Sequence, residues 1–201
     1  MPSCIKSLCA AFLAVLVFCA LFLPCSALET IPSVSAQSAV LMEADSGRII
    51  YEKNARIRMP MASTTKIMTA LLVCEQCNVL DRMRIPKEAV GIEGSSMYLR
   101  EGEVLTVQEL LYGLMLHSGN DAAVALAIYC GGTIEGFAEL MNDKARILGL
   151  TNTHFVNPNG LDAPGHYSTA RDLAILAAYA MENPVFRQTV SAKTIKAGDR
   201  Y

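Results

Sequence analysis

Residues 61–70 read Met61-Ala62-Ser63-Thr64-Thr65-Lys66-Ile67-Met68-Thr69-Ala70, and this stretch decides both the fold and the chemistry expected of the chain. Ser63 and Lys66 are three residues apart, so on a helix they share one face and their polar atoms can meet. The apolar residues that follow predict a buried helix whose N-terminus, at or near Ser63, favours developing negative charge. A serine hydroxyl needs an adjacent base to become a nucleophile, and a lysine of lowered pKa can serve as that base. A capping Ser beside a solvated Lys is the ordinary alternative.

A second polar motif, Ser118-Gly119-Asn120, follows further along the chain. Thr106 and Glu109 predict a capping box that starts an apolar helix before the motif. Another helix is expected from Asp121 to Cys130, closed by two glycines. The motif is therefore expected in a short, rigid loop between two buried helices.

Such a loop can present a hydroxyl and an amide to a cleft. Ser118 can pass a proton between Lys66 and a leaving amine, and Asn120 can bond a substrate peptide amide and help to fix Lys66. The plain alternative is a helix–loop–helix turn, where Ser, Gly and Asn are common. Both motifs together, in this order, favour a serine acyl-transfer site.

The chain resembles the serine-type D-alanyl-D-alanine carboxypeptidases, which are low-molecular-mass penicillin-binding proteins of the β-lactamase/transpeptidase-like superfamily. The resemblance runs from Ser38 to about Glu182, and Gly119 favours this family over class A β-lactamases. It is carried by the two motifs and by residues 39–47, Tyr98-Leu99-Arg100-Glu101-Gly102-Glu103, Thr153-His154-Phe155 and Asn157-Pro158-Asn159-Gly160-Leu161-Asp162.

The resemblance implies an acyl-enzyme on Ser63, Lys66 as proton acceptor, Ser118 as a second active-site hydroxyl and Asn120 as a substrate-binding residue. It implies a peptidoglycan stem peptide ending in D-Ala-D-Ala as substrate and β-lactams as inhibitors, with no cofactor and no metal. Vegetative wall maturation and sporulation are both left open as physiological roles.

The fold class that the resemblance implies is α+β, with a helical cluster packed on an antiparallel sheet. The residues themselves predict a first hairpin, Val40 to Met42 and Ile49 to Tyr51, and later helices over residues 133–148 and 169–181. The second of these helices is expected to stop before Pro184.

The family's last sheet strands, including one that bears a Lys-Thr-Gly motif, are expected beyond this chain. Lys193-Thr194-Ile195 imitates the start of that motif, but Ile stands where Gly is needed. The missing strand would supply a second oxyanion donor beside the N–H of Ser63, and a clamp for the substrate carboxylate. Residues 28–201, a partial catalytic domain, are therefore expected to be inactive alone. A truncated or vestigial module that binds cell-wall peptide is the alternative function.

The N-terminus predicts export. Residues 1–27 have a basic start, an apolar run and small residues before Leu28, as in a cleaved signal peptide. An uncleaved membrane anchor is the alternative. We expect an extracytoplasmic location at the cell wall or membrane face, with membrane association left to a C-terminal part absent from these residues. The net charge of −2 excludes a nucleic-acid footprint.

The three cysteines outside residues 1–27 and the three histidines are expected to be structural. Cys74 and Cys77 have C-x-x-C spacing, but without a second pair or a nearby His they are better interpreted as buried helical thiols. With Cys130 they make an odd number, which argues against a complete disulfide framework. His117 is expected to pack or to cap the end of its helix, and His154 and His166 are not spaced as metal ligands.

Overall fold

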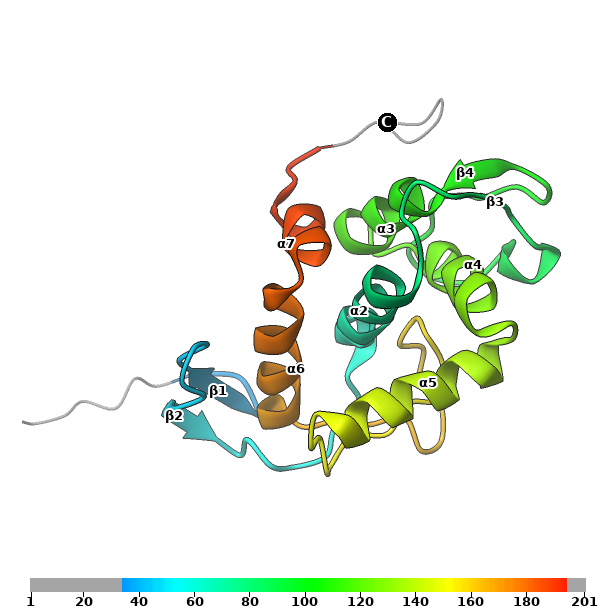
Figure 1. The fold of residues 1–201 in the computed structure, drawn as a ribbon. Helices are drawn as coiled ribbons and strands as arrows, with labels where there is room; N and C mark the ends of the chain where they lie inside the picture. Colours follow the sequence, from blue (N-terminus) through cyan, green and yellow to red (C-terminus); the bar gives the residue numbers. More distant parts are fainter. Residues whose placement is uncertain (1–33, 195–201) are drawn as a thin grey trace, which may run out of the picture. The chain divides into compact units, whose positions relative to one another are not determined.

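Helix α2 (Lys66–Gln76) lies at the centre of the helical cluster, with four other helices packed around it (Figure 1). The computed structural model describes residues 34–194, so the predicted signal peptide lies outside the described residues. The surrounding helices are α3 (Val107–Leu116), α4 (Asn120–Gly131), α5 (Ile134–Ile147) and α6 (Ala170–Glu182). The buried side chains of α2 run from Met68 to Val73, which confirms the apolar helix predicted after Lys66.

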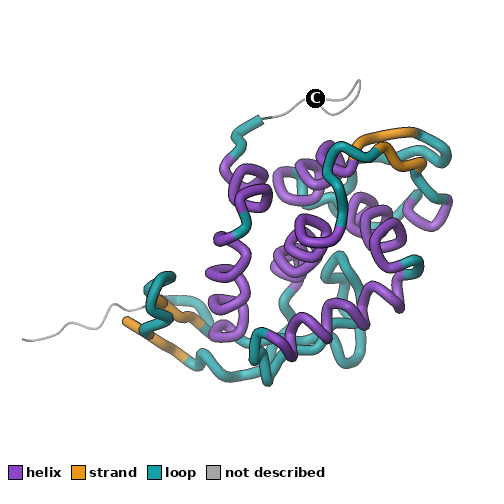
Figure 2. The backbone as a smooth tube through the Cα atoms, in the orientation of Figure 1, coloured by secondary structure: helices purple, strands orange, loops and turns teal. Residues whose placement is uncertain are grey.

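Short elements connect and flank these helices (Figure 2). They are the strands β1 (Ala39–Met42), β2 (Ile49–Lys53), β3 (Arg82–Arg84) and β4 (Val104–Thr106), the 3-10 turns η1 (Ala62–Thr65) and η2 (Lys87–Ala89), and the helix α7 (Pro184–Ser191). In the described part the strands form two antiparallel pairs, β1 with β2 and β3 with β4.

The β1–β2 hairpin confirms the first predicted hairpin. Val40 pairs with Glu52 and Leu41 with Tyr51, and Gly47 takes a positive φ of 69° in the turn between them. Strand β1 packs against α6. The β3–β4 hairpin was not predicted, because each of its strands buries a single side chain, Met83 or Leu105, and so shows almost no periodicity.

Threonine side chains cap the starts of three helices, and the capping box predicted from Thr106 and Glu109 is confirmed. Thr106 and Glu109 form the capping box of α3, and the Thr133 and Thr169 side chains accept from the first turns of α5 and α6. Pro184 does end α6, as predicted, but it also begins α7, with the Asn183 side chain as cap. Helix α7 was missed because proline was treated only as a stop, although it is also favoured at the first helical position.

The core is one apolar cluster built mainly from the helices. Its largest fully buried side chains include Phe137, Phe155, Met68, Leu71, Leu110, Leu114, Met141 and Leu176. Within residues 34–194 no single helix is long and apolar enough to cross a membrane, and α4 with α5 meets that test only as a pair bent by 82°.

Candidate active site

Ser63 lies in the 3-10 turn η1, directly before α2, and its side chain is exposed. Pro60 lies before this turn and outside the helix. The turn is tightly wound, because Ala62 has a positive φ of 45° and Thr64 donates its N–H to Met61 O at 3.1 Å. The predicted position of Ser63 at the N-terminus of a buried helix is confirmed.

Lys66 is the first residue of α2 and is only 2% exposed. Its Nζ atom has three partners: Ser63 Oγ at 3.2 Å, Asn120 Oδ1 at 2.7 Å and the backbone oxygen of Asn159 at 2.6 Å. Burial of the amine lowers its pKa from 10.5 to about 8, because the charged form loses its hydration. About a tenth of the amine is therefore neutral at pH 7, far more than for a lysine with its ordinary pKa.

The partners of Lys66 determine where its lone pair points. The amide oxygen of Asn120 and the carbonyl oxygen of Asn159 can only accept hydrogen bonds. In the neutral amine these two oxygens hold the two remaining N–H groups. The third direction, toward Ser63 Oγ, is then left to the lone pair. The geometry thus suits a base that takes the Ser63 proton.

Ser118 lies in the short connection between α3 and α4, as predicted. Its Oγ donates to Ser63 Oγ at 2.9 Å, so the two serine hydroxyls and Lys66 Nζ form a continuous chain of polar atoms. Ser118 has a positive φ of 56°, a strained conformation for a residue with a Cβ. Hydrogen bonds hold this connection in place, from Gly119 N to Gly113 O at 3.1 Å and from Asn120 N to Ser95 O at 2.7 Å.

Asn120 begins α4 and is buried, with 5% of its surface exposed. Besides accepting from Lys66, its amide group donates from Nδ2 to Glu93 O at 2.7 Å. An Asn side chain has two donor hydrogens and two acceptor lone pairs, so one of each remains for a substrate. The structure thus shows the contact with Lys66 that was predicted for Asn120, while its contact with substrate stays a prediction.

Asp121, not singled out from the sequence, supports this side of the site. Its buried carboxylate accepts from Ser96 Oγ at 2.7 Å, Met97 N at 2.9 Å and Leu99 N at 3.0 Å. These bonds order the segment whose Glu93 and Ser95 carbonyls hold Asn120. The Met97 side chain also fills the space beside Gly113, where a Cβ would lie 1.8 Å from its sulfur.

The connection between α5 and α6 supplies the other side of the site, and the sequence did not predict its contribution. It places Asn159 O on Lys66, and Pro158 O accepts from Thr69 Oγ1 at 2.6 Å. Gly160, with a φ of 89°, passes so close to the nucleophile turn that a Cβ there would lie 1.9 Å from Ala62 O. The signal was present in the sequence as Asn157-Pro158-Asn159-Gly160, which helped to carry the family resemblance but was given no role in the site.

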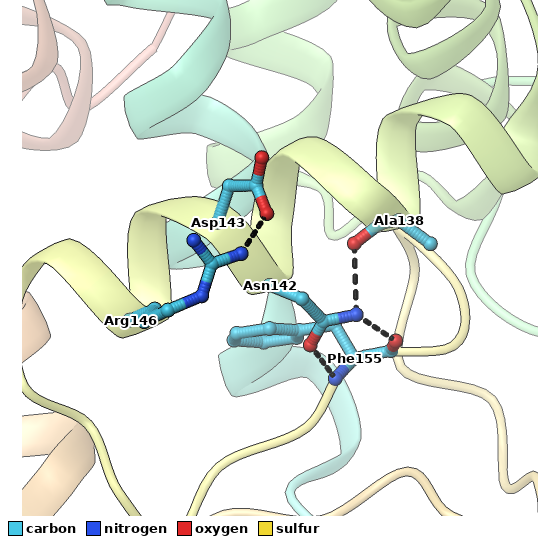
Figure 3. A network of polar contacts seen from close by, with 5 residues as sticks. All are labelled: Ala138, Asn142, Asp143, Arg146 and Phe155. Atoms are coloured by element: carbon cyan, nitrogen blue, oxygen red, sulfur yellow. Dashed lines mark hydrogen bonds and ion pairs between the residues drawn. The ribbon is translucent and has the colours of Figure 1, made fainter.

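Asn142 on α5 anchors this connection at Phe155 (Figure 3). The Asn142 side chain accepts from Phe155 N at 2.8 Å and donates to Phe155 O at 2.8 Å, as well as to Ala138 O of its own helix at 2.9 Å. Phe155 is itself 1% exposed. The neighbouring Asp143–Arg146 ion pair lies on the exposed face of α5. The carbonyls that hold Lys66 and Thr69 therefore belong to a well-anchored segment.

His166 joins the same connection to the turn of the nucleophile. It is buried, with Nε2 2.8 Å from Thr65 Oγ1, and its Nδ1 accepts from Val156 N at 3.0 Å. A backbone amide only donates, so Nδ1 carries no proton and Nε2–H donates to Thr65. Burial lowers the pKa of His166, with His154 adding to that effect and Asp162 opposing it. The absence of metal-ligand spacing had led the sequence interpretation to give this residue no role.

The other histidines and the cysteines of α2, which were expected to have no catalytic role, occupy structural positions. His117 is the C-cap of α3, and His154 bonds Gly165 O through Nδ1 at 2.8 Å. Across residues 34–194, no three His, Cys, Asp or Glu side chains are grouped to hold a metal ion. Cys77 is the C-cap of α2 rather than inside the helix, and both it and Cys74 are half-buried rather than buried.

A buried lysine, two serine hydroxyls and an asparagine thus lie together at the N-termini of two core helices, the arrangement expected of the serine acyl-transfer class of penicillin-recognising proteins. The family model for D-alanyl-D-alanine carboxypeptidase, peptidase family S11, matches residues 26–198. The chain belongs to this family.

Individual relatives agree with this assignment. The chain is 47% identical over 147 residues to the D-alanyl-D-alanine carboxypeptidase DacF of Bacillus subtilis, covering 71% of this chain and 38% of the relative. It is 43% identical over 156 residues to DacC of Escherichia coli, covering 72% of this chain and 39% of the relative. The chain thus spans about two fifths of the length of these relatives.

The solved structures show the same fold. The crystal structure of penicillin binding protein 6B from Escherichia coli matches with a TM-score of 0.80 at 35% identity, covering 85% of this chain and 57% of that one. The predicted α+β, β-lactamase/transpeptidase-like class is confirmed, with the described residues forming the helix-rich part of it.

Proposed function

We propose that the protein which carries these residues is a serine DD-peptidase that removes the terminal D-alanine from peptidoglycan stem peptides. The observation that supports this most strongly is the chain of polar atoms from Lys66 Nζ through Ser63 Oγ to Ser118 Oγ. The names of the similar proteins supply the substrate class, D-alanyl-D-alanine. The names of the similar structures suggest β-lactams as acylating inhibitors.

Acylation begins with neutral Lys66. Its lone pair takes the Ser63 proton while Ser63 Oγ attacks the carbonyl carbon of the penultimate D-alanine, and the negative charge moves to the carbonyl oxygen. The backbone N–H of Ser63, which lies in the turn η1 directly before α2, is the proposed donor to that charge. Asn120 and the Asn159 carbonyl keep the lysine oriented throughout.

Collapse of the intermediate breaks the peptide C–N bond. The leaving amine needs a proton, and Ser118 Oγ, 2.9 Å from Ser63 Oγ, can relay it from the protonated Lys66. D-alanine leaves, and the remaining stem peptide is an ester of Ser63. Water then attacks this ester, with Lys66 again as the base, and restores the serine.

The direct test is a chimera in which residues 36–194 replace the matching segment of the Bacillus subtilis relative, which provides the rest of the fold. We expect covalent labelling by fluorescent penicillin at Ser63 and release of D-alanine from a stem-peptide mimic. A folded chimera that takes up no label would contradict the proposal and favour the vestigial peptide-binding module. Residues 28–201 alone are expected to remain unlabelled.

Export is a second part of the proposal. Residues 1–27 have the composition of a signal peptide, so the mature chain should begin at Leu28. N-terminal sequencing of protein recovered outside the cytoplasm tests this. A mature product that keeps the first residues would identify the segment as a membrane anchor.

A further inference from the structure

Two thiols from different helices meet at the C-terminal ends of α2 and α4. Cys77 directly follows α2, and Cys130 lies one residue before the end of α4. Their Sγ atoms are 2.9 Å apart, although 53 positions separate the residues in the sequence. Both side chains are half-buried, so a small reagent has access to them.

We propose that Cys77 and Cys130 form a disulfide bond that ties the end of α2 to the end of α4. A disulfide has an S–S distance of roughly 2.05 Å, so from 2.9 Å the sulfurs need to approach by less than about 1 Å. The surrounding segments are already held together, because Tyr129 OH, beside Cys130, donates to Asp81 Oδ2 at 3.1 Å. The remaining approach of the sulfurs is small enough for side-chain adjustment to supply it.

The C-x-x-C spacing of Cys74 and Cys77 suggests the rival pairing. Cys74, however, lies within α2, while Cys77 already has Cys130 as its sulfur neighbour. Burial, with the charges of Cys77 and Glu75, raises the pKa of the Cys74 thiol to about 12. Cys74 is therefore almost entirely an unreactive thiol at physiological pH. Cys74 then stays a free thiol, so the odd number of cysteines in the described residues does not prevent one cross-link.

The oxidation needs an external disulfide, such as oxidised glutathione or the disulfide of a thiol oxidoreductase. The hydrogen bond with Cys130 lowers the pKa of Cys77 and raises that of Cys130, so the Cys77 thiolate attacks first. Its sulfur bonds to one sulfur of the reagent and releases the other as a thiolate. Cys130 then loses its proton and attacks Cys77 Sγ, which forms the Cys77–Cys130 bond and releases the second thiol. Two protons leave, and the reagent carries away the two electrons.

The cross-link would act on the helices that carry the proposed site. Lys66 is the first residue of α2 and Asn120 the first residue of α4, so the bond fixes the far ends of both helices. Closing a long stretch of chain restricts the unfolded state strongly, and the predicted effect is on stability. The proposed export would place the pair in an oxidising environment, but the pairing itself rests on the sulfur distance.

The test uses the full-length gene product, purified without reductant and equilibrated with oxidised glutathione. After alkylation of free thiols, non-reducing peptide mapping should find Cys77 linked to Cys130 and Cys74 alkylated. Reduction should lower the midpoint of thermal unfolding by roughly 5–10 °C. Cys74→Ser is the matched control and should keep both the cross-link and the shift, whereas Cys77→Ser and Cys130→Ser should lose both.

Two results would overturn the proposal. One is complete alkylation of Cys77 and Cys130 in the folded, oxidised wild-type protein. The other is a Cys74–Cys77 link as the dominant species. Both are read from the wild-type protein, so they stand even if a variant fails to fold, and neither depends on whether the protein reacts with penicillin.

Discussion

The candidate site has two sides that differ in how the sequence encodes them. One side is borne by helices, with Ser63 and Lys66 before and at the start of α2 and Asn120 at the start of α4. The other is borne by the α5–α6 connection and acts through the backbone carbonyl of Asn159 and the close approach of Gly160. The first side supplies the side chains of the proposed chemistry, whereas the second orients them. Substitutions on the helix side should therefore reduce the acylation rate. Substitutions on the loop side should instead destabilise the fold or misorient Lys66.

The largest expected effect is on the helix side. In the full-length gene product, Ser63→Ala should abolish covalent penicillin labelling, because the attacking oxygen is gone. Lys66→Ala should slow acylation by about a hundredfold or more, the usual loss for a general base. Lys144→Ala is the matched control and should acylate normally. Lys144 pairs with Glu75 at 2.7 Å near the C-terminal end of α2, whereas Lys66 lies at its start. Stopped-flow acylation measures all three, and normal acylation by Lys66→Ala would remove Lys66 from its proposed role.

The next effect is on the loop side and appears as loss of structure. Gly160→Ala should greatly reduce the folded fraction, because its Cβ would lie 1.9 Å from Ala62 O, in a backbone conformation with a φ of 89°. Gly165→Ala is the matched control: its φ is 87°, but the nearest atoms to its Cβ are 3.8 Å away. Thermal unfolding of both variants separates the steric clash from the backbone strain. Equal destabilisation of the two would show that the approach of Gly160 to the nucleophile turn is unimportant.

The same contrast explains which features the sequence could predict. Ser63, Lys66, Ser118 and Asn120 lie in two short contiguous motifs, each beside a helix boundary. Asn159 acts through its main chain, which every residue possesses, so its side-chain type gave no signal. Gly160 and His166 gain their roles only from tertiary contact with η1, which the local pattern of turn residues does not encode.

A third prediction concerns pH and the coupling of the two sides. Lys66 must be neutral to act as a base, and its pKa is about 8. The acylation rate should therefore rise about tenfold per pH unit below pH 8 and level off above it. Acylation by a neutral penicillin reporter between pH 6 and 10 measures this profile. A rise that continues to about pH 10 would show that burial does not lower the pKa of Lys66 in the working enzyme.

The smallest expected effect concerns His166 and stability in mild acid. The folded protein needs Nδ1 unprotonated, because Val156 N–H donates to it, and burial lowers the pKa of His166 below 6.5. The unfolded chain then binds more protons just below pH 6.5, so the free energy of unfolding should fall as the pH drops through that window and stop falling below the folded pKa.

We expect the melting temperature of the full-length wild-type protein to fall by roughly a few degrees between pH 7.5 and pH 5 through this residue. His166→Gln should be less stable at pH 7.5, because it loses the bridge between Val156 N and Thr65 Oγ1, but its melting temperature should change less with pH. Thr65→Val keeps the imidazole and the Val156 contact, so it should retain the wild-type pH dependence while losing one hydrogen bond. An undiminished pH dependence in His166→Gln would assign the acid sensitivity to other groups and leave His166 as a packing residue.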